Sequence, residues 1–306
     1  MAIAVGPPAK PQRGKKASLS PTPLKATSET AYGYPRNFLG NRFVYIVISP
    51  RARGLSIGVN FNPDKRCNFD CIYCEVDRSA SAPHQVLDVD AMSAELERTL
   101  QLVQEGTLQT LPPYRNLPPE LLKLRHVTLS GDGEPTIAGN FGEAVQAVTH
   151  VRAIGQFPFF KIVLVTNASG LDFPNVQVGL KLLIRHDEIW AKLDAGTQFW
   201  MDKINRTQVS LAKIPSNILL VASQRPVIIQ SLFPSIYGTE PSAREIEEYA
   251  RRLLQLREAG AQISLVQIYS ASRPTPHSEC GHLSLRSLSE IAQTVRKVTG
   301  LKVEVF

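Results

Sequence analysis

The chain has 306 residues, of which 43% are hydrophobic, enough to bury the core of one large α/β domain or two smaller ones. No apolar run approaches the roughly 20 residues that a membrane span needs, and the N-terminus lacks the order of charges of a signal peptide, so we expect a cytoplasmic protein. Three of the four cysteines lie within residues 67–74, which excludes a disulfide framework and favours metal binding or catalysis.

The positive charge is concentrated at the N-terminus. The formal net charge is +7, of which residues 1–30 carry +4, so the rest of the chain is close to neutral. This segment is also rich in Pro, Ser and Thr, a composition that cannot bury enough apolar surface to order itself. We therefore predict a disordered basic tail over residues 1–35 and a folded domain over residues 36–306.

Short β-branched runs at 42–49 and 55–62 predict the first two strands. An amphipathic helix is expected over 89–104, where Met92, Leu96 and Leu100 recur at helical spacing behind a cap at Asp88 or Asp90. Two Pro-Pro pairs make the following segment, 107–120, an extended loop.

Strands and helices then alternate regularly to the end of the chain. Strands are expected at 126–130, 161–167, 188–194, 226–233, 263–269 and 302–306, and helices at 141–153, 175–184, 242–258 and 286–298. Continuously apolar strands in βα alternation indicate a parallel sheet buried on both faces. Six core repeats without a G-x-G-x-x-G turn favour a full or partial barrel over an open Rossmann sheet.

The second strand leads into the pattern C-x3-C-x2-C, formed by Cys67, Cys71 and Cys74. Thiolates bind zinc or iron–sulfur clusters, and a structural zinc site would need Cys280, His84 or another histidine to complete it. Zinc ligands usually come as two close pairs, which this spacing matches poorly, so Cys280 is interpreted as a free thiol. Three thiolates on a four-iron cluster would leave one iron open to another ligand.

This motif resembles that of the radical S-adenosylmethionine (SAM) superfamily, including the aromatic Tyr73 just before the last cysteine. The resemblance implies a partial (βα)6 TIM-type barrel in which the three cysteines hold a [4Fe–4S] cluster and SAM chelates the open iron. One electron, from a donor such as flavodoxin or ferredoxin, would cleave SAM to methionine and a 5′-deoxyadenosyl radical that abstracts hydrogen from the substrate.

The resemblance also implies a SAM site at the strand ends. The turn "SGDGEPT" (130–136) provides a glutamate to receive the SAM ammonium group and glycines that permit close backbone approach. Each of the later positions could equally be a satisfied polar group at a strand end, and Ile268 is a reasonable apolar contact for adenine. The expected cofactor-binding residues are Tyr73, Gly131, Asp132, Gly133, Glu134, Thr166, Asn167, Lys192, Asp194, Gln267 and Ile268.

Shorter phrases resemble the tRNA wyosine synthases within this superfamily. Those enzymes carry further cysteines for a second cluster, whereas residues 1–66 contain none, so tRNA is possible as a substrate but not favoured. A basic patch of Arg51, Arg53, Lys65 and Arg66 beside the cysteines could support it, although a solvated rim is the simpler interpretation. The substrate stays unassigned, with a peptide or glycyl-radical maturase and a zinc-stabilised nucleic-acid-binding protein as alternatives.

Deletion of residues 1–30 tests the predicted tail. We expect the truncated protein to keep its melting temperature and its capacity to bind iron, because a disordered segment contributes little to a core. Differential scanning calorimetry and iron analysis measure both, and a truncated protein that loses either would show that the tail is structural.

Overall fold

The computed structural model describes residues 38–78, 86–273 and 275–306. The predicted tail, residues 1–35, lies wholly outside the described residues, so its disorder and the domain boundary at residue 35 stay predictions. Within the described ranges, no helix combines the length and apolar character needed to cross a membrane.

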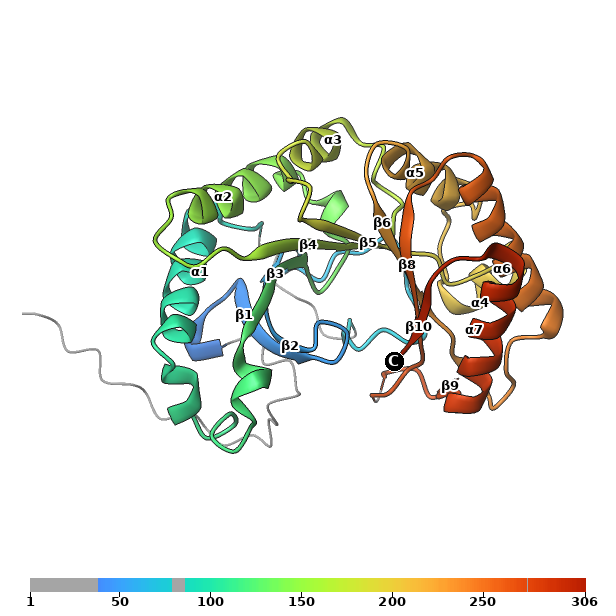
Figure 1. The fold of residues 1–306 in the computed structure, drawn as a ribbon, viewed down its shortest axis with the longest axis horizontal. Coiled ribbons are helices and arrows are strands. Elements are labelled where there is room, and N and C mark those ends of the chain that lie inside the picture. The colour runs from blue at the N-terminus through green and yellow to red at the C-terminus, as the bar shows by residue number, and fades with distance from the viewer. Residues whose placement is uncertain (1–37, 79–85, 274) are drawn as a thin grey trace, which may run out of the picture.

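An eight-stranded mixed sheet forms the centre of the molecule, in the order β1-β2-β3-β4-β5-β6-β8-β10. The sheet curves so that its helices lie on the convex side (Figure 1). Its strands are β1 (Val44–Ser49), β2 (Gly54–Asn60), β3 (Leu124–Ser130), β4 (Lys161–Thr166), β5 (Glu188–Lys192), β6 (Val227–Leu232), β8 (Ile263–Tyr269) and β10 (Val303–Val305). The six strands β2 to β6 and β8 are parallel, as expected for a partial (βα)6 barrel.

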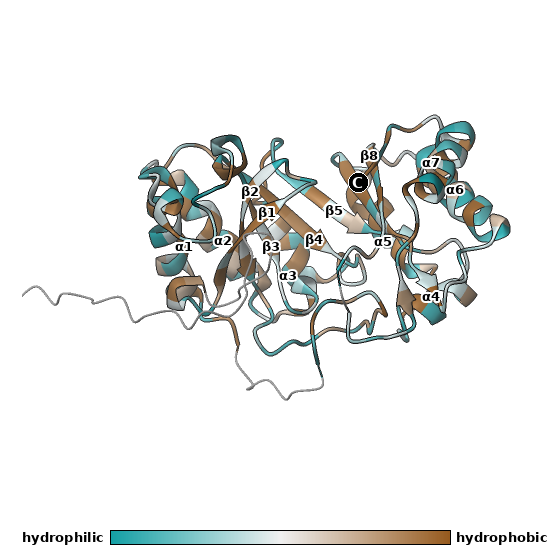
Figure 2. Cartoon of the chain, turned by 90° about the horizontal axis from the view of Figure 1, so that it is seen from below, coloured by the Kyte–Doolittle hydropathy of each residue, from teal (hydrophilic) through white to brown (hydrophobic). Residues whose placement is uncertain are grey.

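The helices connect successive strands and cover the outside of the sheet. They are α1 (Val89–Gln104), α2 (Phe141–Ala153), α3 (Pro174–Leu180), α4 (Gln198–Ile204), α5 (Lys213–Ala222), α6 (Ala243–Glu258) and α7 (Leu285–Thr299). The outer surfaces of α1, α6 and α7 are more hydrophilic than the strands (Figure 2). Helix α1 matches its prediction, and Asp88 is its cap because its carboxylate accepts the N–H of Ala91 at 3.0 Å.

Three details differ from the sequence prediction. Strand β1 is antiparallel to β2, so the prediction of an all-parallel sheet is wrong at this edge. The connection between these strands is too short for a crossover, which parallel pairing requires. Helices α4 and α5 were not predicted, and neither was the small two-stranded antiparallel sheet of β7 (Ser235–Ile236) and β9 (Cys280–Gly281). The predicted extended loop at 107–120 contains two short 3₁₀ turns, Thr107–Thr110 and Pro119–Leu122.

Alternate residues of each strand point to opposite faces of the sheet. Ile57, Val127 and Ile162 are fully buried in the main apolar core, which the helices share. On the other face the hydroxyls of Ser56 and Thr128 lie 2.6 Å apart. The concave face therefore carries polar groups. In a barrel of this kind, functional residues lie at the carboxyl ends of the strands.

Glu95 of α1 attaches the start of β1 to the helix layer. Its buried carboxylate accepts the backbone N–H groups of Arg42, Phe43 and Val44 at 2.9, 2.8 and 3.1 Å. These hydrogen bonds are charge-assisted. Because they are buried, a donor that loses its acceptor lowers the stability of the fold.

Glu95→Gln should therefore lower the free energy of unfolding by about 2 kcal/mol, because the amide offers only one acceptor oxygen and sets an N–H against backbone donors. Urea denaturation measures the change. Glu97→Gln on the same helix is the control and should change stability by less than about 0.5 kcal/mol; equal losses in both variants would contradict this role for Glu95.

Candidate active site at the carboxyl ends of the strands

The cysteine loop follows β2 and lies against the end of α4. The backbone N–H groups of Asp70 and Ile72 donate to the carbonyls of Asn205 and Ile204 at 3.0 and 2.9 Å. Ile72 is fully buried and Phe69 nearly so, and these two side chains anchor the loop in the core. The three cysteines remain partly accessible.

Burial keeps the first two thiols protonated. It raises the pKa of Cys67 to about 12, with the Glu134 carboxylate adding to the effect. It also raises the pKa of Cys71 to about 11, although the donors Asn205 and Tyr73 act in the opposite direction. Since thiolates are the metal-binding form, these positions need a positive group close by before they ionise at neutral pH.

Arg78 supplies positive charge at the loop. Its Nη1 lies 3.1 Å from the sulfur of Cys74, its Nη2 donates to the carbonyl of Asp132 at 3.1 Å, and its Nε donates to the carbonyl of Lys65 at 3.2 Å. Burial opposes a charge on Arg78, but the cysteines outweigh it in their thiolate form and raise the pKa of Arg78. The guanidinium therefore links the cysteine loop to the glycine turn after β3, a role that the sequence analysis missed.

Glu134 joins the ends of β3 and β4. Its buried carboxylate accepts the hydroxyls of Thr136 and Thr166 at 2.6 and 2.5 Å, and the backbone N–H groups of Thr136 and Asn167 at 3.1 and 2.7 Å. Burial raises the pKa of Glu134, and these four donors counter the increase. Three predicted site residues, Glu134, Thr166 and Asn167, are thus in direct contact.

Gly133 brings the turn against the cysteine loop. A Cβ at this position would lie 1.7 Å from the carbonyl oxygen of Arg66, so a larger residue cannot occupy it without moving the backbone. The N–H of Glu134 donates to the same carbonyl at 3.2 Å. Gly131 lies against Asn60 and Asn62, and Asn60 also binds the Asp132 carboxylate at 2.8 Å. Two motifs about 60 residues apart in sequence therefore form one surface.

A second polar cluster lies at the end of β5. Tyr73 donates its hydroxyl to the Asp194 carboxylate, and Lys192 lies 3.3 Å from the other Asp194 oxygen. Burial opposes a charge on Lys192, but Asp194 and then the Tyr269 hydroxyl outweigh it and raise the lysine pKa. Asn205, which the sequence analysis missed, contacts Cys71, Tyr73 and Asp194.

The structure separates two residues that the sequence analysis placed together at β8. Gln267 is buried and accepts from Gln230 at 3.1 Å, whereas Ile268 is fully buried in the core that the helices share. Neighbouring strand residues point to opposite faces, so Ile268 does not reach the site. Two residues of the proposed basic patch make separate contacts. Arg51 stacks 4.3 Å from the ring of Tyr269, whose hydroxyl lies 3.3 Å from Lys192. Arg53 lies 3.5 Å from Glu304.

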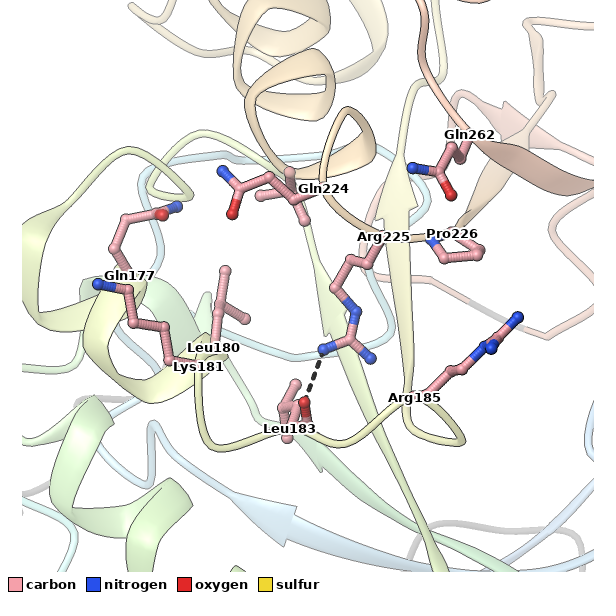
Figure 3. A pocket seen from close by; sticks show the side chains of 10 residues that line it. Gln177, Leu180, Lys181, Leu183, Arg185, Gln224, Arg225, Pro226 and Gln262 are labelled. Carbon is pink, nitrogen blue, oxygen red and sulfur yellow. Dashed lines mark hydrogen bonds between the residues drawn. The ribbon is translucent and has the colours of Figure 1, made fainter.

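A cavity of about 480 Å³ lies elsewhere in the molecule, before the amino ends of β5 and β6. Arg225 donates there to the carbonyl of Leu183 at 3.1 Å (Figure 3). The cavity contains neither a cysteine nor a residue of the glycine turn. In a parallel barrel, chemistry collects at the carboxyl ends of the strands, so we assign the candidate site to the cysteine loop and not to this cavity at the opposite end.

Comparison with known proteins agrees with this architecture. No protein-family model matches the chain. A UPF0026 protein of Synechocystis is 27% identical over 183 residues, which span 59% of this chain and 58% of that protein. A UPF0026 protein of Helicobacter pylori is 26% identical over 246 residues, which span 76% of this chain and 70% of that protein.

Among solved structures, a radical SAM methyltransferase from Sphaerobacter thermophilus superposes with a TM-score of 0.59 at 16% identity, covering 86% of this chain and 68% of that chain. The chain has the radical SAM fold. TYW1 with a lysine–pyruvate adduct bound gives a TM-score of 0.54 at 13% identity and 85% coverage of both chains. Streptococcus suis SuiB bound to SAM gives a TM-score of 0.54 at 14% identity, covering 80% of this chain and 49% of that chain. The radical SAM fold predicted from the cysteine motif is thus confirmed.

Gly133→Ala tests the contact between the turn and the loop. We expect a loss of about 2 kcal/mol in unfolding free energy and faster proteolysis within residues 64–78, since the new methyl group must displace the Arg66 carbonyl. Gly139→Ala is the matched control, because a Cβ there meets no atom within 4 Å. Unchanged stability and proteolysis in Gly133→Ala would contradict the close approach.

Proposed function

We propose that this chain is a radical SAM enzyme in which Cys67, Cys71 and Cys74 hold a [4Fe–4S] cluster. When bound, the cluster supplies the electron that cleaves SAM to methionine and a 5′-deoxyadenosyl radical, which abstracts hydrogen from the substrate. The observation that supports this most directly is the contact between the two motifs, through Gly133, the Glu134 N–H and Arg78.

The donor set fits a group larger than one ion. In the described part of the chain, no three His, Cys, Asp or Glu side chains lie close enough together to share a single metal. Three thiols on one loop suit a four-iron cluster in which three irons bind one cysteine each and the fourth iron stays open. Arg78 offsets part of the negative charge that three thiolates bring into a half-buried site.

The remaining polar residues can bind and orient SAM. Glu134 offers a buried carboxylate for the ammonium group, and Thr166 and Asn167 hold that carboxylate in place. Lys192 provides a cation for a carboxylate, and the aromatic ring of Tyr73 lies 4.9 Å from its Nζ. The reductant, expected to be flavodoxin or ferredoxin, and the cytoplasmic location stay predictions.

A wyosine-synthase-like activity is the second candidate, favoured by the 85% coverage of TYW1. That structure contains a lysine–pyruvate adduct, and imine formation requires a neutral amine. Lys192 is the lysine of the strand-end cluster, and Asp194 holds it in the charged form. We therefore propose a hydrogen-abstracting enzyme whose substrate is unassigned and does not form an imine at Lys192.

Single cysteine substitutions test the cluster. Anaerobically purified Cys67→Ala, Cys71→Ala and Cys74→Ala should lose most of their iron and sulfide and release no 5′-deoxyadenosine from SAM with dithionite, because each thiolate fills one iron position. Iron and sulfide analysis and chromatography measure both. Cys280→Ala is the control, since Cys280 lies in the small β7–β9 sheet and not in the cysteine loop, and it should keep both.

Two results would count against the proposal. Zinc in place of iron in the wild-type protein would favour the zinc-stabilised nucleic-acid-binding alternative. Loss of iron in Cys280→Ala would show a fourth protein ligand and leave no open iron for SAM.

A further inference from the structure

Asn205 lies at the junction of α4 and the cysteine loop. It follows the last residue of α4 and is 2% exposed. Its backbone carbonyl accepts the N–H of Asp70, and the carbonyl of Ile204 accepts the N–H of Ile72. These two hydrogen bonds fix the backbone of Asn205 relative to the loop. The fold therefore determines where the Asn205 side chain lies.

The side-chain amide of Asn205 is directed at a cysteine sulfur. Its Nδ2 lies 3.3 Å from the sulfur of Cys71, 2.9 Å from the hydroxyl oxygen of Tyr73 and 3.3 Å from Oδ2 of Asp194. The Tyr73 hydroxyl donates its own hydrogen to Asp194, so its oxygen is available as an acceptor. The two N–H groups of the amide are thus shared among three acceptors, one of which is sulfur.

The other two cysteines have donors of different kinds. The backbone N–H of Phe69 lies 3.5 Å from the sulfur of Cys67, within the loop itself. Arg78 lies 3.1 Å from Cys74 and belongs to the same loop segment. Asn205 is the one side chain among these donors that reaches the loop from a separate helix and is almost fully buried.

We propose that Asn205 is a positioning residue that raises the reduction potential of the cluster by donating an N–H to the sulfur of Cys71. This inference rests on the proposed function. Reduction adds one negative charge to the cluster and its thiolates, and a donor aimed at a ligand sulfur stabilises that charge. A buried donor is effective because little water competes for the sulfur.

Asn205→Leu tests the inference, because leucine is similar in size and has no N–H to donate. The protein is purified anaerobically with its cluster, and the reduced form is titrated against potential by electron paramagnetic resonance. We expect normal iron and sulfide and a midpoint shifted to more negative potential. At a fixed potential, the ratio of reduced to oxidised cluster should fall roughly three- to tenfold, as for the loss of one ordinary hydrogen bond.

Asn41→Leu is the matched control. Asn41 is also buried, and its amide donates to the carbonyl of Val44 and the hydroxyl of Thr99, on the β1 side of the sheet. Its loss should destabilise the fold and leave the midpoint unchanged. If leucine at position 205 prevents cluster assembly, Asn205→Ala removes the same N–H with a smaller side chain and should shift the midpoint in the same direction.

An unchanged midpoint in a fully loaded Asn205 variant would overturn the inference. Failure of both Asn205 variants to hold a cluster, with Asn41→Leu loaded normally, would also overturn it and make Asn205 a structural clamp of the loop. A wild-type protein that holds no iron–sulfur cluster would instead refute the proposed function itself. The three outcomes are distinguishable by iron analysis and the titration alone.

Discussion

A buried carboxylate, that of Glu134, holds the candidate site together. Removing such a charge from water is costly unless donors replace the water, and four donors from Thr136, Thr166 and Asn167 do so. These donors come from the turn after β3 and from the end of β4. The hydrogen bonds to the Glu134 carboxylate therefore hold the ends of β3 and β4 together. The N–H of Glu134 then bonds to Arg66, which places the cysteine loop relative to both.

The sheet and most of the helices could be predicted from the sequence because their signals are local. Apolar strands, the period of α1 and the cap at Asp88 each depend on residues close together in the chain. The apolar pattern of β1 suits either strand direction, and the antiparallel pairing was indicated only by the short connection to β2. Helix α5 did carry a signal, with Ile214, Ile218 and Val221 at helical spacing, but Pro215 in its first turn obscured it.

The site was predictable where a motif is contiguous and not where it depends on packing. The cysteines and the turn around Glu134 are recognisable as short phrases. Asn205 and Arg78 are ordinary polar residues in sequence, and their importance follows from contacts with Cys71 and Cys74 that only the fold provides. Ile268 was included because it is next to Gln267 in the chain, but neighbouring strand residues point to opposite faces, and Ile268 lies in the core.

The curved sheet is not closed by a ladder of hydrogen bonds, since in the described structure β1 pairs with β2 and β10 with β8, but these two ends do not pair with each other. Across this seam, the guanidinium of Arg51 stacks 4.3 Å from the Tyr269 ring, and Arg53 lies 3.5 Å from Glu304. Contacts of this kind are weak, and the exposed ion pair weakens further with salt. In the described structure, side-chain contacts rather than strand pairing therefore bring the two edges of the sheet together.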